Sequence, residues 1–243
     1  VGSQMSRLLA DRWDLTLFDV KTPTAYGENC RVLVGDMANE QDVGFAVKGA
    51  DAILHLACVH GETISFEETL NVNYRGTVSL LDAAVANGVR GITFTSYYHG
   101  WGYHPRKATP LGESAPPRPD GWYGISKIWA EAALSFYADA HGLSATSLRI
   151  GNCGPSVANE RTSRMWISFE DLARLVELSL ARGDIGHMSV FATGDCDAPF
   201  FDNGVAKALG FGPLDRAQDN FAAPSVGLEG AGQDMFGRSI GGG

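Results

Sequence analysis

The feature that most constrains the fold is a regular alternation of short apolar segments with longer amphipathic ones. Residues 52–57, 91–96 and 145–150 are too short for helices and are apolar on both faces, as strands buried in a parallel sheet are. Further strands are predicted at 15–18, 31–34 and 189–191. Helices are predicted at 1–10, 41–47, 71–87, 122–140, 169–182 and near 202–209. This order predicts an α/β protein with a doubly wound parallel sheet and helices on both faces. Ligands of such sheets lie beyond the carboxyl ends of the strands.

Composition and charge argue against several classes of partner. The net charge of −9 comes without any run of Lys or Arg, which disfavours nucleic acid and acidic membrane surfaces. No apolar run approaches the ~20 residues of a membrane span, and the first residues do not resemble a secretory signal. The cysteines contain no Cys-x-x-Cys pair, which favours reduced thiols over a zinc site or a disulfide framework. We therefore expect a cytoplasmic protein that binds a small molecule and holds no metal.

Tyr123 and Lys127 stand four residues apart at the start of a predicted long helix, so their side chains share one face. A phenol titrates near ~10 in water. A neighbouring ammonium favours the phenolate and lowers that pKa, which would let Tyr123 act as a base near neutral pH. Such a base suits the removal of a proton from an alcohol whose carbon loses a hydride. A chance pairing of the two residue types is the alternative, and their surroundings must decide.

Several polar residues stand where predicted strands end. Asp19 would accept hydrogen bonds from both ribose hydroxyls of an adenosine and repel a 2′-phosphate, which favours NAD over NADP; it could equally be a helix cap or a turn residue. Asp36 could accept from the adenine amino group or cap the helix that follows. Gly2 could be the last glycine of a phosphate-binding loop or only the entry to a helix. These residues predict a dinucleotide site.

The order of these residues carries a family resemblance. The chain has Asp19, Asp36, His55-Leu56-Ala57, Asn73-x-x-Gly76-Thr77 and Tyr123-x-x-x-Lys127 in sequence. Over residues 1 to about 220 it therefore resembles the extended short-chain dehydrogenase/reductase, or NAD-dependent epimerase/dehydratase, family with its Rossmann-type sheet. Six segments are similar to uronate dehydrogenases: 94–99, 118–121, 149–153, 159–161, 166–168 and 201–203.

The resemblance implies an activity: NAD-dependent oxidation of a hexuronate, such as glucuronate or galacturonate, at C1 to an aldarolactone. Tyr123 would be the base, and Lys127 would hold the nicotinamide ribose. Arg161 would bind the sugar carboxylate, because a guanidinium fork matches it with two parallel hydrogen bonds; a surface arginine is the alternative. A nucleotide-sugar epimerase or dehydratase of the same superfamily, or an NAD-binding protein with impaired catalysis, are the competing interpretations.

The remaining site residues are implied by the same resemblance. Asn73 would order a helix and a proton-relay water, although a buried Asn bonded to backbone explains it equally well. His99 would lie near the sugar hydroxyls with Tyr98 and Ser96, and each could equally be a packed polar residue. The residues expected to contact NAD are Gly2, Asp19, Asp36, Met37, Leu56, Ala57, Asn73, Tyr123, Lys127, Ile150, Asn152 and Cys153.

The chain departs from the family pattern at two places. The family's catalytic serine sits one residue after Ser96, where this chain has Tyr97. Either Ser96 takes the role through a local shift, or Tyr97 or Tyr98 substitutes for the serine. The family's first strand and the first two glycines of its cofactor loop have no counterpart from Val1 onward, so we expect a sheet that lacks its first strand and a chain truncated at its N-terminus.

The predicted organisation has three parts. Residues 1–150 form the dinucleotide-binding domain, 151–223 form a small substrate-binding annex, and the Gly-rich segment 224–243 is expected to be disordered. We also expect a homo-oligomer.

Overall fold

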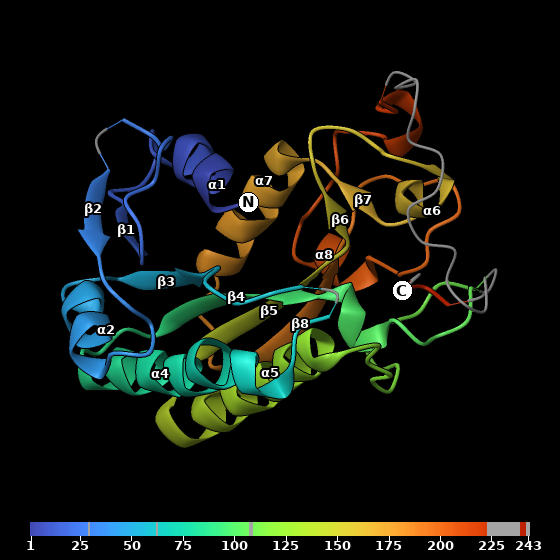
Figure 1. The fold of residues 1–243 in the computed structure, drawn as a ribbon. Coiled ribbons are helices and arrows are strands. Elements are labelled where there is room, and N and C mark those ends of the chain that lie inside the picture. The colour runs from blue at the N-terminus through green and yellow to red at the C-terminus, as the bar shows by residue number, and fades with distance from the viewer. Residues whose placement is uncertain (29, 62, 107–108, 223–238, 242–243) are drawn as a thin grey trace.

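The structure is a computed structural model that describes residues 1–28, 30–61, 63–106, 109–222 and 239–241. Its centre is a four-stranded, fully parallel sheet (Figure 1). The strands follow the order β3 (Ala52–His55), β4 (Gly91–Tyr97), β5 (Ser144–Ile150) and β8 (Gly186–Ala192). Every residue of β5 is buried, as expected for a strand covered on both faces. In the register of β4 and β5, Tyr97 lies beside Ile150, so the carboxyl ends of these strands meet at one edge.

A second, two-stranded sheet lies apart from the first in Figure 1. It pairs β1 (Thr16–Asp19) in parallel with β2 (Arg31–Val34). Among the described residues β1 has no pairing with β3, so the parallel sheet is divided between these two strands. This is the arrangement predicted for a doubly wound sheet without its first strand, and the predicted fold class is confirmed.

Helices cover both faces of the main sheet (Figure 1). One face carries α2 (Glu40–Val47), α4 (Thr77–Ala86) and α5 (Trp122–His141), and the other carries α1 (Gly2–Leu9) and α7 (Phe169–Leu180). Leu134 of α5 and Ile92 of β4 belong to the core on the first face, and Leu175 of α7 and Val190 of β8 to the core on the second. Full burial of each such side chain contributes about 1.5–3 kcal/mol.

Local sequence explains where the long helices begin and end. Ser168 caps α7 because its hydroxyl accepts from the Asp171 amide at 3.0 Å. Gly142 ends α5 in the left-handed conformation, with φ of 70°. The predicted helix 71–87 instead begins with a π-helical segment, Leu70–Gly76, before α4. Short π segments in helices occur frequently at functional sites.

Shorter elements surround the carboxyl edge of the sheet. They are α3 (Phe66–Thr69), η2 (Tyr98–Trp101), β6 (Asn152–Cys153), α6 (Glu160–Ser163), β7 (Trp166–Ile167), α8 (Gly204–Ala208) and η3 (Ala217–Asp219). The two short strands β6 and β7 pair in parallel. Across the ranges that the structure describes, no helix is both long and apolar enough to cross a membrane.

The predicted domain boundary at Ile150 is wrong in one respect. Strand β8 pairs along its whole length with β5, and α7 packs on β3 and β4, so both belong to the main unit. The annex is reduced to residues 151–168, between β5 and α7, and to the loops and short elements after β8. Of the tail, residues 223–238 and 242–243 lie outside the described residues. Ser239–Gly241, expected to be disordered, lies against the protein, and the side chain of Ile240 is buried.

Candidate active site

Tyr123 and Lys127 lie on the first two turns of α5, above the carboxyl ends of β4 and β5. Gly124 between them explains how the helix comes so close to the loop after β4: a Cβ there would overlap the His99 carbonyl. The Lys127 ammonium lies 5.5 Å from the centre of the Tyr123 ring and 4.6 Å from that of Phe94. The predicted pairing of the phenol and the ammonium on one helix face is therefore present.

Lys127 is buried and donates from Nζ to the Thr95 carbonyl at 2.7 Å. Its burial lowers the pKa of the ammonium, and interactions with Cys58 and Glu131 oppose that shift. The ammonium is thus held in place by the backbone of β4.

The pKa of Tyr123 shifts in the direction opposite to the one expected from the Tyr–Lys spacing. Burial raises it, and the Cys58 thiol and the phenols of Tyr97 and Tyr98 raise it further. The Cys58 sulfur lies 3.9 Å from the phenol oxygen. The expectation that Lys127 lowers this pKa is wrong for this arrangement, because the ammonium bonds to Thr95 while the phenol lies against a thiol and other rings.

Aromatic and imidazole rings surround the Tyr123 phenol. The ring centre of Tyr97 lies 5.6 Å from that of Tyr123, and that of His99 lies 6.4 Å away. Tyr98 stacks on His99 at 4.4 Å but is only 4% exposed, so its expected contact with substrate is limited to the rim of its ring. His99 Nδ1 is 2.7 Å from an Asp120 carboxylate oxygen, and that pairing directs its Nε2 away from Asp120.

Ser96, expected as a catalytic and substrate-binding residue, is in a different place. Its hydroxyl donates to Glu131 Oε1 at 2.5 Å, and the side chain is 1% exposed. Side chains alternate across a strand, so Ser96 faces inward beneath α5 while the next residue, Tyr97, reaches the site. The prediction of Ser96 at the reacting centre is therefore wrong, and Tyr97 occupies the place beside Tyr123.

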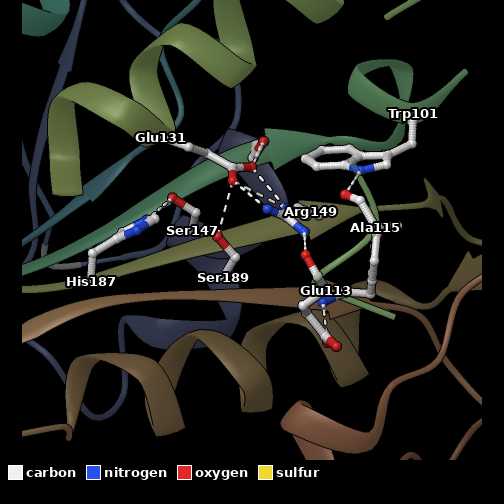
Figure 2. Close-up of polar contacts among 10 residues, drawn as sticks. Trp101, Glu113, Ala115, Glu131, Ser147, Arg149, His187 and Ser189 are labelled. Atoms are coloured by element: carbon white, nitrogen blue, oxygen red, sulfur yellow. Dashed lines mark hydrogen bonds and ion pairs between the residues drawn. The ribbon is translucent and has the colours of Figure 1, made fainter. Parts of the chain in front are cut away.

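Glu131 is the centre of a buried polar network beneath the site (Figure 2). Arg149 donates to both of its carboxylate oxygens, at 2.7 to 3.1 Å. Ser189 donates to the same carboxylate at 3.0 Å. The Arg149 guanidinium also lies 3.8 Å from the centre of the Trp101 ring and donates to the Glu113 carbonyl at 2.9 Å. The charges are paired and hydrogen-bonded, as buried charges must be.

Asn73 is a buried Asn bonded to backbone, the second of the two alternatives given for it. Its amide donates to the Val59 carbonyl and accepts from the Val59 amide, both at 2.8 Å, and donates to Ser126 Oγ at 3.0 Å. It thereby ties the loop after β3 to the helix that carries Tyr123.

Gly2, Asp19 and Asp36, which are expected to contact a dinucleotide, lie at the start of α1, at the end of β1 and just after β2. Asp19 ends β1 and is exposed, with one carboxylate oxygen accepting from the Lys21 amide at 3.1 Å. Asp36 accepts from the Ala38 amide at 2.9 Å, and the helix after it is capped by Asn39 instead. Gly2 begins α1, which has no side-chain cap, and a Cβ on it would lie 3.9 Å from Leu56 Cδ1.

Four of these expected contacts have buried side chains, namely Asn73 and Lys127, described above, and Met37 and Ile150. Met37 is 6% exposed and belongs to the core on the α4 and α5 face, and Ile150 is 4% exposed and belongs to the core on the other face. Ala57 lies one residue after Leu56 and lines a small crevice together with Lys127.

Asn152 and Cys153 form β6 and are half-buried. Burial raises the pKa of the Cys153 thiol to about 12, and Cys153 packs against the core cluster that contains Met5 and Leu9 of α1. Arg161 lies on the short helix α6. Burial raises the pKa of the Tyr97 phenol, and the charge of Arg161 lowers it by a smaller amount. Arg161 is thus close enough to Tyr97 to act on it electrostatically, and Tyr97 lies beside Tyr123.

Several residues at the site were not predicted from the sequence. Cys58 and His60 lie beside Tyr123, with the His60 ring centre 6.2 Å from the phenol ring, and Asp120 holds His99. Their positions in the sequence could have identified two of them: Cys58 directly follows a strand-end segment, and Asp120 stands three residues before Tyr123. The described residues contain no cluster of three or more His, Cys, Asp or Glu side chains placed to hold a metal ion.

Comparison with known proteins shows which family the chain belongs to. Residues 1–175 match the model of the NAD dependent epimerase/dehydratase family. The chain belongs to this family. Among curated members, it is 37% identical over 194 residues to a uronate dehydrogenase from Pseudomonas syringae pv. tomato, covering 80% of this chain and 70% of that protein.

Solved structures of family members share the whole fold. The uronate dehydrogenase from Agrobacterium tumefaciens, solved as a complex with NAD, superposes with a TM-score of 0.86 at 31% identity and covers 98% of this chain and 90% of its own. The glucuronic acid dehydrogenase from Chromohalobacter salexigens gives a TM-score of 0.87 at 27% identity, over 99% of this chain and 91% of its own.

Proposed function

We propose that this protein is an NAD-dependent oxidoreductase that oxidises a hexuronate at C1 to an aldarolactone. The observation that carries the proposal is that Arg161 bonds to the Ile240 carbonyl, while Ile240 packs in one cluster with Tyr98 and Tyr97, and Tyr97 lies beside the Tyr123 of the Tyr123–Lys127 pair. The pair provides groups for proton removal, and the Arg161 guanidinium provides a match for a carboxylate. The family relatives named above support the same activity.

The residues present fit NAD. The Asp19 carboxylate is exposed at the end of β1, where a ribose would lie, and its charge disfavours NADP. The first turn of α1 has no side-chain cap, and its backbone at Gly2 is open, so its amides can approach a pyrophosphate. When bound, NAD supplies the acceptor for a hydride.

The chain's own residues supply the rest of the chemistry. Tyr123 takes the proton of the sugar hydroxyl, and Lys127 favours the phenolate when the phenol turns from Cys58 toward the substrate. Arg161 fixes the carboxylate end of the sugar, and His99, held by Asp120, offers Nε2 to a sugar hydroxyl. Tyr97 lies beside Tyr123, at the position expected for Ser96, and its phenol donates a hydrogen bond there. Positioning of this kind lowers the entropic part of the barrier.

We also propose a cytoplasmic location and a homo-oligomeric state. The location rests on cysteines that are all unpaired.

A substrate screen with a matched variant tests the function. Wild-type protein with NAD should form NADH with glucuronate or galacturonate and far less with glucose or UDP-glucose. Arg161→Ala should raise the Michaelis constant for uronates by roughly 10- to 100-fold, because a charge-assisted fork contributes about 1.5–3 kcal/mol, and should leave residual activity on glucose unchanged. Equal effects on both sugars would remove Arg161 from carboxylate recognition. Turnover of UDP-glucose alone would favour the nucleotide-sugar epimerase instead.

A further inference from the structure

The described residues near the C-terminus, Ser239–Gly241, form a strap against the active-site end of the sheet. The Ile240 amide donates to the His104 carbonyl at 3.0 Å, and the Gly241 amide donates to that of Gly102 at 2.9 Å. The Ile240 side chain is 1% exposed and packs in an apolar cluster with Tyr98, among others. The strap is thus anchored by both its backbone and a buried side chain.

The strap binds Arg161 directly. Arg161 Nη1 donates to the Ile240 carbonyl at 3.0 Å and to the Gly241 carbonyl at 3.2 Å. Both bonds use the same nitrogen, and among the described residues no hydrogen bond engages Nε or Nη2. A guanidinium held at one nitrogen keeps an edge with parallel donors for a planar acceptor such as a carboxylate.

The strap also touches the group that holds His99. A Cβ on Gly241 would overlap the Asp120 carboxylate and would lie 3.2 Å from the Gly102 Cα. Asp120 in turn is paired with His99 Nδ1. One short segment therefore contacts Arg161 and lies against the carboxylate that holds His99, the two side chains that the proposed function assigns to the sugar.

We propose that the strap is a wall of the substrate site and that Ile240 is a positioning residue, which anchors the strap so that its carbonyls hold Arg161 ready for the sugar carboxylate. This inference rests on the proposed uronate oxidation. It predicts that loosening the strap weakens uronate binding through Arg161 and leaves the NAD end of the site unaffected, since within the described ranges the strap bonds to Arg161 and to the backbone of Gly102 and His104 and not to Asp19 or α1.

Steady-state kinetics with NAD in excess test the proposal on four variants: Ile240→Ala, Ile240→Val, Arg161→Ala and the double variant of Ile240→Ala with Arg161→Ala. Coupled residues in one hydrogen-bonded network interact by amounts that correspond to about 2- to 160-fold. We expect Ile240→Ala to raise the Michaelis constant for glucuronate by a factor within that range, with a smaller change in kcat. Ile240→Val should restore most of it, and adding Ile240→Ala to Arg161→Ala should have little further effect.

Leu111→Ala is the matched control, because Leu111 packs against the same apolar cluster without bonding to Arg161. It should leave the Michaelis constant for glucuronate unchanged. Calorimetric titration of NAD should give the same affinity for Ile240→Ala and wild type. These two readouts separate a local effect on Arg161 from general loosening of the fold.

The possible results separate failure of the proposed function from failure of the positioning role. If wild type oxidises no uronate, the proposed function fails. If it does, an unchanged Michaelis constant in Ile240→Ala overturns the positioning role. Full additivity in the double variant also overturns it, since the strap would then act without Arg161. A lower Michaelis constant in Ile240→Ala would contradict the proposal by showing that the strap blocks Arg161.

Discussion

Tyr123, Lys127 and Glu131 lie on successive turns of one face of α5, yet they belong to two groups with different properties. The upper group, around the Tyr123 phenol, pairs that phenol with a thiol at 3.9 Å. The lower group, around Glu131, satisfies its carboxylate with a guanidinium and two hydroxyls. One face of one helix therefore carries a loosely bonded group around Tyr123 at the ligand edge and a fully bonded group around Glu131 about two turns further along.

The difference teaches what sets the role of a polar residue on a buried helix face. Periodicity places all three side chains toward the sheet. The strands then decide what each one meets: β4 offers a carbonyl to Lys127, whereas β5 and β8 offer Arg149 and Ser189 to Glu131. A buried and satisfied charge pair rigidifies its surroundings, and a poorly paired phenol remains available to a ligand. The upper group should therefore control turnover and the lower group stability.

The largest effect should follow Tyr123→Phe, which removes one hydroxyl from the upper group. We expect kcat to fall by about 10²–10⁴-fold, the usual contribution of general acid–base catalysis, with little change in the free energy of unfolding. Because burial raises the pKa of Tyr123, the wild-type rate should increase with pH, and the residual rate of the variant should lose that dependence. Rate–pH profiles of both proteins give the answer, and an undiminished kcat would remove Tyr123 from the mechanism.

Glu131→Gln should have the opposite effect: a large fall in the free energy of unfolding with little direct effect on kcat. It leaves the buried Arg149 charge without its partner, and loss of one member of a buried pair costs about 3–5 kcal/mol of stability. The two side chains are 8% and 9% exposed. Urea unfolding monitored by circular dichroism measures the change. The matched control is Asp197→Asn, which removes a carboxylate partner of Arg216; these two side chains are 52% and 46% exposed, so stability should change little. Similar losses in both variants would contradict the assignment of stability to the lower group.

His55 sharpens the comparison because it is buried near Lys127 and, within the described part of the chain, its ring pairs with the Thr77 hydroxyl and with no carboxylate. Burial lowers its pKa from 6.5 to about 3, and the charge of Lys127 adds to this. The unfolded chain binds a proton below about 6.5 while the folded protein stays neutral at this residue, so stability is lost as the pH falls through that window. The expected slope from this residue is about 1.4 kcal/mol per pH unit.

Urea unfolding at several pH values between 6.5 and 4.5 checks the His55 prediction. His55→Asn should flatten the slope relative to wild type, whereas His141→Asn, at an exposed histidine, should not. Parallel slopes for wild type and His55→Asn would show that His55 is not the source of the acid sensitivity.

The smallest effect should follow Ser96→Ala, which separates the two groups at neighbouring residues of β4. We expect a stability loss of about 1.5–3 kcal/mol, because a hydrogen bond to a charged group is removed, and a kcat within about twofold of wild type. Tyr97→Phe is the companion variant, since it removes the phenol that does lie beside Tyr123. A fall of 100-fold or more in kcat for Ser96→Ala would return Ser96 to the reacting centre.

The sequence predicted the parts of this site that depend on local order. Strand ends placed Asp19 and Asp36 at the ligand edge, and helical spacing placed Tyr123 and Lys127 on one face. Periodicity could not choose between Ser96 and Tyr97, because that choice depends on Glu131 lying 35 residues away and accepting from Ser96. It also could not find the strap, since the partners Arg161 and Ile240 are 79 residues apart and meet through backbone carbonyls.

The prediction that Lys127 lowers the pKa of Tyr123 failed for the same reason. The spacing to Lys127 is local, but the burial and the Cys58 thiol that outweigh it come from other segments. Electrostatic shifts depend on every neighbouring group, and most neighbours of a buried side chain are distant in sequence.

The most direct measurement is the stoichiometry of NADH formed when wild-type protein is mixed with NAD and a limiting amount of D-glucuronate, with the product followed by NMR. One NADH should appear for each uronate consumed, with signals of a lactone, and both should vanish in Tyr123→Phe. If no uronate yields NADH while UDP-glucose changes configuration without net reduction of NAD, the oxidation proposed here is contradicted.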